Sequence, residues 1–325
     1  MAHVGEFALI GRYFDRPLRD RSVTLGIGDD AAVVTVAPGC ELVLAVDMMV
    51  ESRHFLPDAD PRALGHKILA VNLSDIAAMG ARPRWALLAG ALPEFDERWL
   101  DEFTRGLFDL AGMHDVALIG GDTTCGPRNL CLTIAGEVPA GAAVRRSGAI
   151  AGDDVWVSGT LGDAMLALAA LRGTTVLDEV AMTHARRRLE WPTPRVALGQ
   201  SLRGIASAML DVSDGLTGDL GHILDASGVG AIVELSRVPR SAALNERLAG
   251  EERDEALQWL LAGGDDYELC FTAPAARRDD VIALSTQDVA LSRIGVVTSR
   301  ASDLAVLDET GTPLPDVPRA FDHFA

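Results

Sequence analysis

Residues 66–83 read "HKILAVNLSDIAAMGARP", a segment in which polar side chains interrupt a dense apolar pattern. Asp60 suits the N-cap of a helix, Pro61 suits its first turn, and Gly80 supplies a stop, so the pattern predicts a helix over 61–79. The apolar positions fall on opposite sides of this helix. We therefore expect it to be buried on more than one side.

Asp75 lies on this buried helix, where an isolated carboxylate is costly unless something compensates for its charge. A salt bridge to an arginine such as Arg82 or Arg84 would do so. A metal ion would do so as well. The residues alone leave both interpretations open.

The rest of the chain reads as two mixed α/β halves of similar size. A turn-rich stretch over 145–164 suggests a boundary, and we expect domains at 1–148 and 149–325. Short apolar runs predict strands, and amphipathic or capped runs predict helices. The predicted strands are 42–47, 116–122, 130–139, 208–212, 231–235, 267–272 and 292–297. The further predicted helices are 96–112, 163–172, 179–189, 194–207, 216–226 and 253–262.

Composition excludes several classes of protein. The 325 residues carry a net charge of −18, which disfavours nucleic acids and anionic membranes as partners. No apolar run reaches the ~18 residues that span a bilayer, and the N-terminal residues lack a signal-peptide pattern. The four cysteines have no metal-ligand spacing, so we expect a cytoplasmic protein with reduced thiols. Lys67 is the only lysine and does not fit a Walker phosphate loop.

Aspartates recur where apolar runs end, often beside glycine: "LGIGDD", "LAVD", "LIGGD", "MLDVSDG" and "LAGGDD". Each instance alone is also what ordinary turn residues produce. If the aspartates converge, their mutual repulsion of about 4 kcal/mol per close pair calls for divalent cations. An all-oxygen donor set favours Mg²⁺, which commonly bridges carboxylates and substrate phosphates. The candidate ligands are Asp30, Asp47, Asp75, Asp122 and Asp211.

Ten motifs in register resemble one family over essentially the whole chain. They are "GEFALIGRYF", "GIGDDAAV", "VDMMVESRHF", "HKILAVNLSDIAAMGARP", "LIGGDTT", "RSGA", "GDDVWVSGTLGDA", "LDVSDGL", "GGDDYELCF" and "FDHFA". Together they resemble the thiamine-monophosphate kinase family, in the superfamily of aminoimidazole ribonucleotide synthetase. The resemblance implies transfer of the γ-phosphoryl group of ATP to thiamine monophosphate. It implies direct in-line transfer assisted by several Mg²⁺ ions, as a step of thiamine diphosphate biosynthesis.

The resemblance also implies a fold and an assembly. It implies a two-domain fold in which the N-terminal domain pairs with its copy in a homodimer to form a β-barrel. The second domain is a C-terminal α/β domain, and the active sites lie in clefts between the two kinds of domain. ATP and thiamine monophosphate are then the expected partners.

Site residues follow from the motifs one by one. The resemblance implies Mg²⁺ ligation by the five candidate aspartates and by Asp214. It implies ATP binding by Gly121, Asp122, Arg146 and Ser213, and substrate binding by His54, Asp265 and Phe321.

Three departures from the family pattern concern these sites. Ala45 and Val46 replace hydroxyl residues that the family usually has before Asp47. Asp265 replaces a glutamate that is one methylene longer. Phe321 replaces a tyrosine or tryptophan, so a stacking contact is retained and a polar one is lost.

Two alternatives stay open. One is another ATP-dependent synthetase of the same superfamily. The other is a non-catalytic scaffold that binds Mg²⁺ or a nucleotide, which the missing hydroxyls at Ala45 and Val46 favour. His54 disfavours the scaffold, because a scaffold does not need a second substrate site.

Overall fold

The structure is a computed structural model that describes residues 5–17 and 20–318. The chain divides into two compact units. Unit 1 comprises Met1–Ile76 and Ala81–Gly141, and unit 2 comprises Ala77–Gly80 and Ala142–Ala325. Each unit has its own sheet, and we describe each by itself.

Unit 1 is built on a four-stranded sheet in the order β3-β6-β4-β5, so β3 and β5 are its edges. β6 runs antiparallel to both β3 and β4, whereas β4 and β5 are parallel. Helix α1 and the short strands β1 and β2 precede the sheet. The bounds are α1 Glu6–Tyr13, β1 Val23–Leu25, β2 Val33–Val34, β3 Cys40–Val50, β4 Arg82–Leu92, β5 Ala117–Cys125 and β6 Asn129–Pro139.

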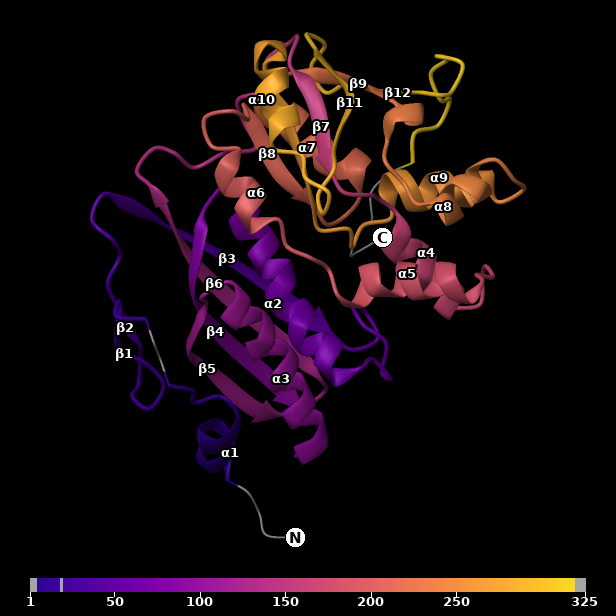
Figure 1. The fold of residues 1–325 in the computed structure, drawn as a ribbon. Coiled ribbons are helices and arrows are strands. Elements are labelled where there is room, and N and C mark those ends of the chain that lie inside the picture. The colour runs from indigo at the N-terminus through magenta and orange to yellow at the C-terminus, as the bar shows by residue number, and fades with distance from the viewer. Residues whose placement is uncertain (1–4, 18–19, 319–325) are drawn as a thin grey trace. The chain divides into compact units, whose positions relative to one another are not determined.

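Helices α2 (Pro61–Ala78) and α3 (Glu97–Met113) lie together against one face of this sheet (Figure 1). The two-sided burial expected of α2 is confirmed, since apolar side chains on both of its sides are less than 5% exposed. Gly65 and Gly106 mark where the two backbones meet. A Cβ at Gly65 would lie 1.9 Å from the Phe103 carbonyl oxygen, so only glycine permits this approach.

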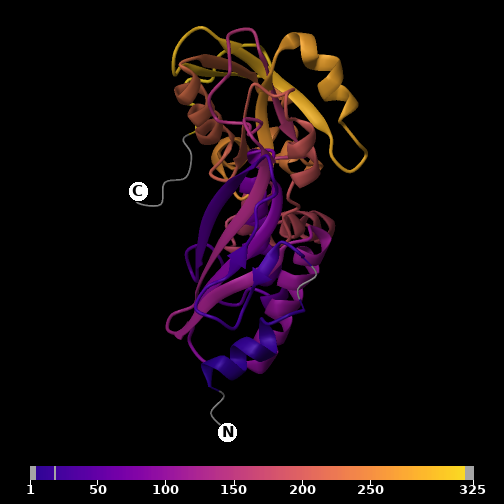
Figure 2. The ribbon, with the colours of Figure 1, turned by 90° about the vertical axis from the view of Figure 1, so that its left-hand side faces the viewer.

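The edge strand β3 has an apolar row on the opposite face of the sheet. Figure 2 shows the backbone of this sheet. Four alternating side chains of this strand are exposed: Leu42 at 44%, Leu44 at 64%, Val46 at 59% and Met48 at 53%. Leu87 on β4 is exposed as well. Alternation along a strand puts the four β3 side chains on one face, so the row is continuous.

Unit 2 contains a six-stranded sheet in the order β12-β9-β11-β7-β10-β8, antiparallel except between β12 and β9. Helix α7 packs on β8, β9 and β10 around one apolar core. The strands are β7 Asp154–Ser158, β8 Ala208–Val212, β9 Gly230–Glu234, β10 Glu268–Ala273, β11 Leu291–Thr298 and β12 Leu304–Leu307. The α-helices are α4 Asp163–Leu171, α5 Glu179–Glu190, α6 Val196–Ser201, α7 Leu216–Ser227, α8 Ala242–Leu248, α9 Arg253–Ala262 and α10 Arg278–Ala283.

Two expectations about the elements are wrong. The helix predicted over 194–207 is only the short α6, because Leu202 caps it and Gly204 takes a positive φ of 71°. Asp47 and Asp122 do not end their strands. Both lie inside long strands whose backbone pairing continues for three further residues.

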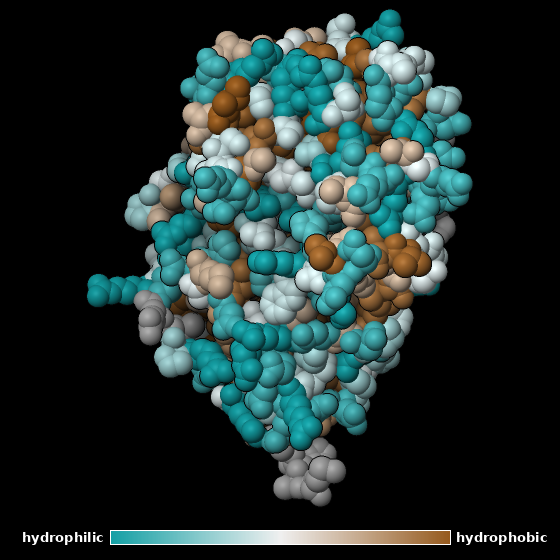
Figure 3. Space-filling view, turned by 45° about the vertical axis from the view of Figure 1, so that its right-hand side comes forward, coloured by the Kyte–Doolittle hydropathy of each residue, from teal (hydrophilic) through white to brown (hydrophobic). Residues whose placement is uncertain are grey.

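No helix in the described ranges combines the length and apolarity needed to cross a membrane. Hydrophilic residues cover most of the face in Figure 3, with hydrophobic residues gathered in a few groups. This surface agrees with the strongly acidic composition.

Candidate functional site

Asp30 lies in the loop that joins β1 to β2, and its side chain is exposed like that of Asp29. The Asp30 backbone N–H donates to Asp29 Oδ1 at 2.9 Å, so the first carboxylate fixes the turn on which the second is presented. The Asp29 carboxylate thus accepts the hydrogen bond within the turn, whereas the Asp30 carboxylate takes no part in that bond.

Asp47 and Asp122 lie on opposite edges of the unit 1 sheet. Asp47 on β3 pairs with Leu132 on β6, and Leu132 pairs with Leu88 on β4. Leu88 in turn pairs with Gly121 on β5, which is one residue before Asp122. Three strand spacings separate the two edges by about 14 Å. The one-residue offset also directs the two side chains to opposite faces, Asp47 toward α2 and α3. One chain therefore does not bring these two carboxylates to one metal ion.

Asp75 and His54 are half-buried residues of unit 1. Asp75 lies near the C-terminal end of α2, on the same covered side of the sheet as Asp47. His54 follows β3, and its Nδ1 accepts a hydrogen bond from the Val50 N–H at 3.0 Å. A neutral His54 therefore has its proton on Nε2.

The carboxylates are chemically suited to Mg²⁺, although they are not gathered in advance. Within residues 5–17 and 20–318, no three His, Cys, Asp or Glu side chains form a group that could hold a metal ion. The candidate ligands are all carboxylate oxygens, and Asp30 and Asp122 are exposed to incoming ions. Hard oxygen donors with room for waters and phosphate oxygens are what Mg²⁺ prefers.

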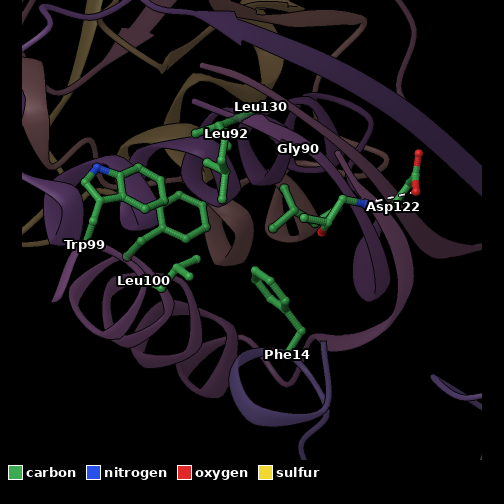
Figure 4. Close-up of a pocket in the computed structure, with 10 residues that line it drawn as sticks. Phe14, Gly90, Leu92, Trp99, Leu100, Asp122 and Leu130 are labelled. Carbon is green, nitrogen blue, oxygen red and sulfur yellow. Dashed lines mark hydrogen bonds between the residues drawn. The ribbon is translucent and has the colours of Figure 1, made fainter. Parts of the chain in front are cut away.

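A small apolar pocket of unit 1 lies beside Asp122 (Figure 4). Phe14, Leu92, Trp99 and Leu130 are among its lining residues, and its volume is about 20 Å³. This is room for one water, so the pocket does not hold a nucleotide base. Figure 4 shows the Asp122 carboxylate directed away from the apolar side chains, where it accepts the Thr123 N–H at 2.9 Å.

In unit 2, Asp211 lies buried on β8, the loop after β8 carries Ser213 and Asp214, and the buried Asp219 holds this loop in place. Asp219 Oδ2 accepts the backbone N–H groups of three successive residues, Ser213, Asp214 and Gly215, at 3.0, 3.0 and 3.1 Å. Three converging N–H groups ordinarily form a site for an anion such as phosphate. Here the Asp219 carboxylate fills that site, so these three N–H groups are not available to a phosphate.

The buried position of Asp219 changes the pKa of its carboxyl group. Burial, reinforced by the neighbouring Asp211 carboxylate, raises the pKa of Asp219 to about 7, although the backbone N–H groups oppose the shift.

A second loop, residues 263–267, packs on the first and carries Asp265. The Asp265 N–H donates to the Ser213 carbonyl at 2.8 Å, so the structure brings these two predicted site residues together. Gly264 makes this possible, since it has φ of +75° and a Cβ there would lie 2.4 Å from the Ser213 carbonyl oxygen. Tyr267 Oη donates to Asp265 Oδ1 at 2.9 Å and orients that carboxylate.

Buried charges support the second loop from behind. Asp265 and Tyr267 have φ of +60° and +51°, which non-glycine residues adopt only when their surroundings enforce it. Glu268, fully buried, is paired by Arg188 at 2.7 Å and by Arg195 at 2.5 Å. This ion-pair network fixes the start of β10, the strand into which the loop leads.

Arg146 and Phe321 are the two remaining predicted site residues. Arg146 is exposed, and its carbonyl accepts from Ser227 Oγ at 3.4 Å. Phe321 lies outside the described residues.

Sequence reasoning missed the buried residues that hold these loops. Asp219 has a usable signal, because an acidic residue in the first turn of a helix can accept preceding N–H groups. Glu268, Arg188 and Arg195 have none, since their pairing joins residues more than 70 positions apart.

Both halves of the chain match known protein families. The family model for AIR synthase related protein, N-terminal domain, matches residues 28–138. The model for AIR synthase related protein, C-terminal domain, matches residues 151–307.

Relatives that align with nearly the whole chain include thiamine-monophosphate kinases. Thiamine-monophosphate kinase of Salmonella typhimurium strain LT2 is 46% identical over 330 residues, which cover 99% of this chain and 98% of the relative. The crystal structure of thiamine-monophosphate kinase from Stenotrophomonas maltophilia K279a is 47% identical, with a TM-score of 0.85 over 96% of this chain and 98% of that one. The structure of AaThiL complexed with AMPPCP and TMP is 29% identical, with a TM-score of 0.76 over 99% of this chain and 97% of that one.

The raised pKa of Asp219 predicts a specific pH dependence of stability. The folded chain holds this proton to higher pH than the unfolded chain does. The contribution of Asp219 to the free energy of unfolding is therefore complete below pH 3.8 and is lost as the pH rises through about 7. Because Asn does not titrate, we expect the free energy of unfolding of Asp219→Asn to rise relative to that of the wild type, by up to about 1.4 kcal/mol per pH unit within this window.

Urea unfolding of chelator-treated protein, at several pH values across the window, measures this difference. Asp225→Asn, an exposed acid on the same helix, is the matched control and should follow the wild type. Parallel pH profiles for the two variants would contradict the prediction.

Proposed function

This chain belongs to the thiamine-monophosphate kinase family of AIR synthase-related proteins, and we propose that it phosphorylates thiamine monophosphate with ATP to give thiamine diphosphate. The observation that carries the proposal is full-length similarity at 46% identity to a protein of that name. A related structure holds AMPPCP and TMP together, which supports a site for a nucleotide and a phosphorylated acceptor.

The residues of each unit have distinct roles in this proposal. We assign nucleotide and metal binding and dimerisation to domain 1–148, and the supporting α/β domain to 149–325. When bound, Mg²⁺ would neutralise phosphate charge and align the γ-phosphoryl group with its acceptor for direct in-line transfer. The carboxylates that would hold it are Asp30, Asp47, Asp75, Asp122, Asp211 and Asp214. The residues that would contact ATP are Gly121, Asp122, Arg146 and Ser213.

Three residues would bind the acceptor. His54, whose Nδ1 is engaged by Val50, presents an Nε2–H that can donate to a phosphate oxygen. Asp265, oriented by Tyr267, offers a carboxylate acceptor to the substrate. Phe321 would stack on a ring of the substrate. We place the reaction in the cytoplasm, which the free state of all four cysteines supports.

Purified protein is expected to form thiamine diphosphate from thiamine monophosphate, ATP and excess Mg²⁺. With γ-³²P-ATP, the label should pass to the product and should never be found on protein, since direct transfer assigns no residue of the site as a covalent acceptor. Asp75→Asn should fold and lose turnover by at least about a hundredfold, because the metal would lose a carboxylate ligand.

Chromatographic separation of labelled products, with gel analysis of the protein, provides the measurement. Absence of thiamine diphosphate under these conditions would overturn the proposed function. A labelled protein would instead overturn direct transfer.

We further propose that the chain works as a homodimer whose unit 1 sheets join into a β-barrel. The exposed row of Leu42, Leu44, Val46 and Met48 supports this, since monomeric proteins rarely leave a continuous apolar strand face on an edge strand. Burying it against a second copy would stabilise the pair by roughly 1.5 kcal/mol or more per large side chain.

Leu44→Glu is expected to shift the chain from dimer to monomer, because a charge would enter the apolar row. Met113→Glu is the matched control, since Met113 is apolar and even more exposed than Leu44, at 78% against 64%, but lies at the end of α3. Light scattering coupled to gel filtration measures the mass. Equal behaviour of both variants would argue against this interface.

A further inference from the structure

A buried cluster in unit 1 contains none of the predicted site residues and lies at the base of the segment that carries Asp30. This segment, residues 20–37, comprises β1, the Asp29–Asp30 loop and β2. Its own secondary structure is slight, with three and two residues in its strands. Something outside the segment must therefore hold the exposed aspartates in one place.

Arg84 binds the beginning of the segment. Its Nη2 donates to both carboxylate oxygens of Asp20 at 3.0 Å and to Ser22 Oγ at 2.9 Å. The indole Nε1 of Trp85 donates to the same Ser22 Oγ at 3.2 Å. The Arg84 and Asp20 side chains are only 13% and 17% exposed, so water competes weakly for these contacts.

Glu137 binds the end of the segment. Its Oε1 accepts the Ala37 N–H at 2.6 Å, and its Oε2 accepts from Arg84 Nη1 at 2.5 Å. The Glu137 side chain is 6% exposed. One ion pair between β4 and β6 therefore reaches both ends of residues 20–37, which are 17 positions apart.

The two ends are also joined to each other. The Thr35 N–H donates to the Ser22 carbonyl at 2.8 Å. Both ends of the segment thus meet the sheet at one place, and Asp29 and Asp30 project from a closed loop. Although burial opposes ionisation, hydrogen bonds from Ser22 and Arg84 hold the pKa of Asp20 below its usual value, so this carboxylate stays charged beside the guanidinium.

We propose that Arg84 and Glu137 are positioning residues that clamp both ends of residues 20–37 and so fix Asp30 for metal binding. The carboxylate at the tip belongs to a loop with little secondary structure in a strongly acidic protein, where repulsion would otherwise spread it away from other carboxylates. Holding the loop from its base lowers the conformational entropy that metal binding must overcome. The metal role rests on the proposed function, whereas the clamping of the segment does not.

The clamp makes two measurable differences. Arg84→Gln is expected to raise the Mg²⁺ concentration at half-maximal activity by about tenfold while kcat at saturating Mg²⁺ is retained, as for residues that orient a ligand without touching the metal. In the protein without Mg²⁺ or nucleotide, amides of residues 23–35 should exchange hydrogen faster, and those of unit 2 should not.

Arg82→Gln is the matched control, because Arg82 lies two residues away on β4 with an exposed side chain. Arg84→Lys should fall between the wild type and Arg84→Gln, since a single ammonium cannot serve Asp20, Ser22 and Glu137 in a planar fork. Should Arg84→Gln fail to fold, Ser22→Ala removes one contact from each of Arg84 and Trp85 and should show the same effects in smaller measure.

Asp30→Asn separates the clamp from the proposed function. If Asp30→Asn changes the Mg²⁺ dependence and Arg84→Gln does not, the positioning role is overturned. If Asp30→Asn leaves the Mg²⁺ dependence unchanged, the metal role of Asp30 fails, while amide exchange still decides whether the segment is clamped. Unchanged exchange over residues 23–35 in Arg84→Gln, or an equal increase in both units, overturns the clamp itself.

Discussion

Mutual repulsion between carboxylates is the constraint on which the arrangement of this protein depends. Loops that present several aspartates cannot hold one another, because each charge pushes its neighbours away. In both units, the restraint comes from buried polar groups behind the loops. Arg84 and Glu137 restrain the Asp30 segment, Asp219 restrains the loop after β8, and Glu268 supports the loop of Asp265. The buried polar groups thus fix the positions of loops whose aspartates repel one another.

Much of the scaffold follows from local patterns in the sequence. The α2 helix was predictable because Pro61 and Gly80 mark its ends and apolar residues occupy both of its sides. Strand β4 was not predicted, since "RPRWALLAGAL" begins with two arginines around a proline and alternates poorly. The helix predicted over 194–207 was too long, because Gly204 adopts a backbone conformation that a helix excludes.

The chemistry of the candidate site was also predictable, whereas its geometry was not. Aspartates near glycines suggest cations without any knowledge of the fold. Sheet order decides which of them meet, and order depends on pairing between distant strands. Asp47 and Asp122 therefore look equivalent in sequence but lie on opposite edges of one sheet. Long-range partners such as Arg84 with Asp20 were invisible for the same reason.

The apolar row on β3 also makes a newly synthesised chain prone to association with other chains. An edge strand with unpaired backbone groups and exposed Leu44, Val46 and Met48 is a template for any other extended segment. A single folded copy is therefore vulnerable to aggregation until that edge is covered. The net charge of −18 counteracts this hazard by keeping separate copies apart in the crowded period after synthesis. Acidity in this chain serves colloidal stability as well as chemistry.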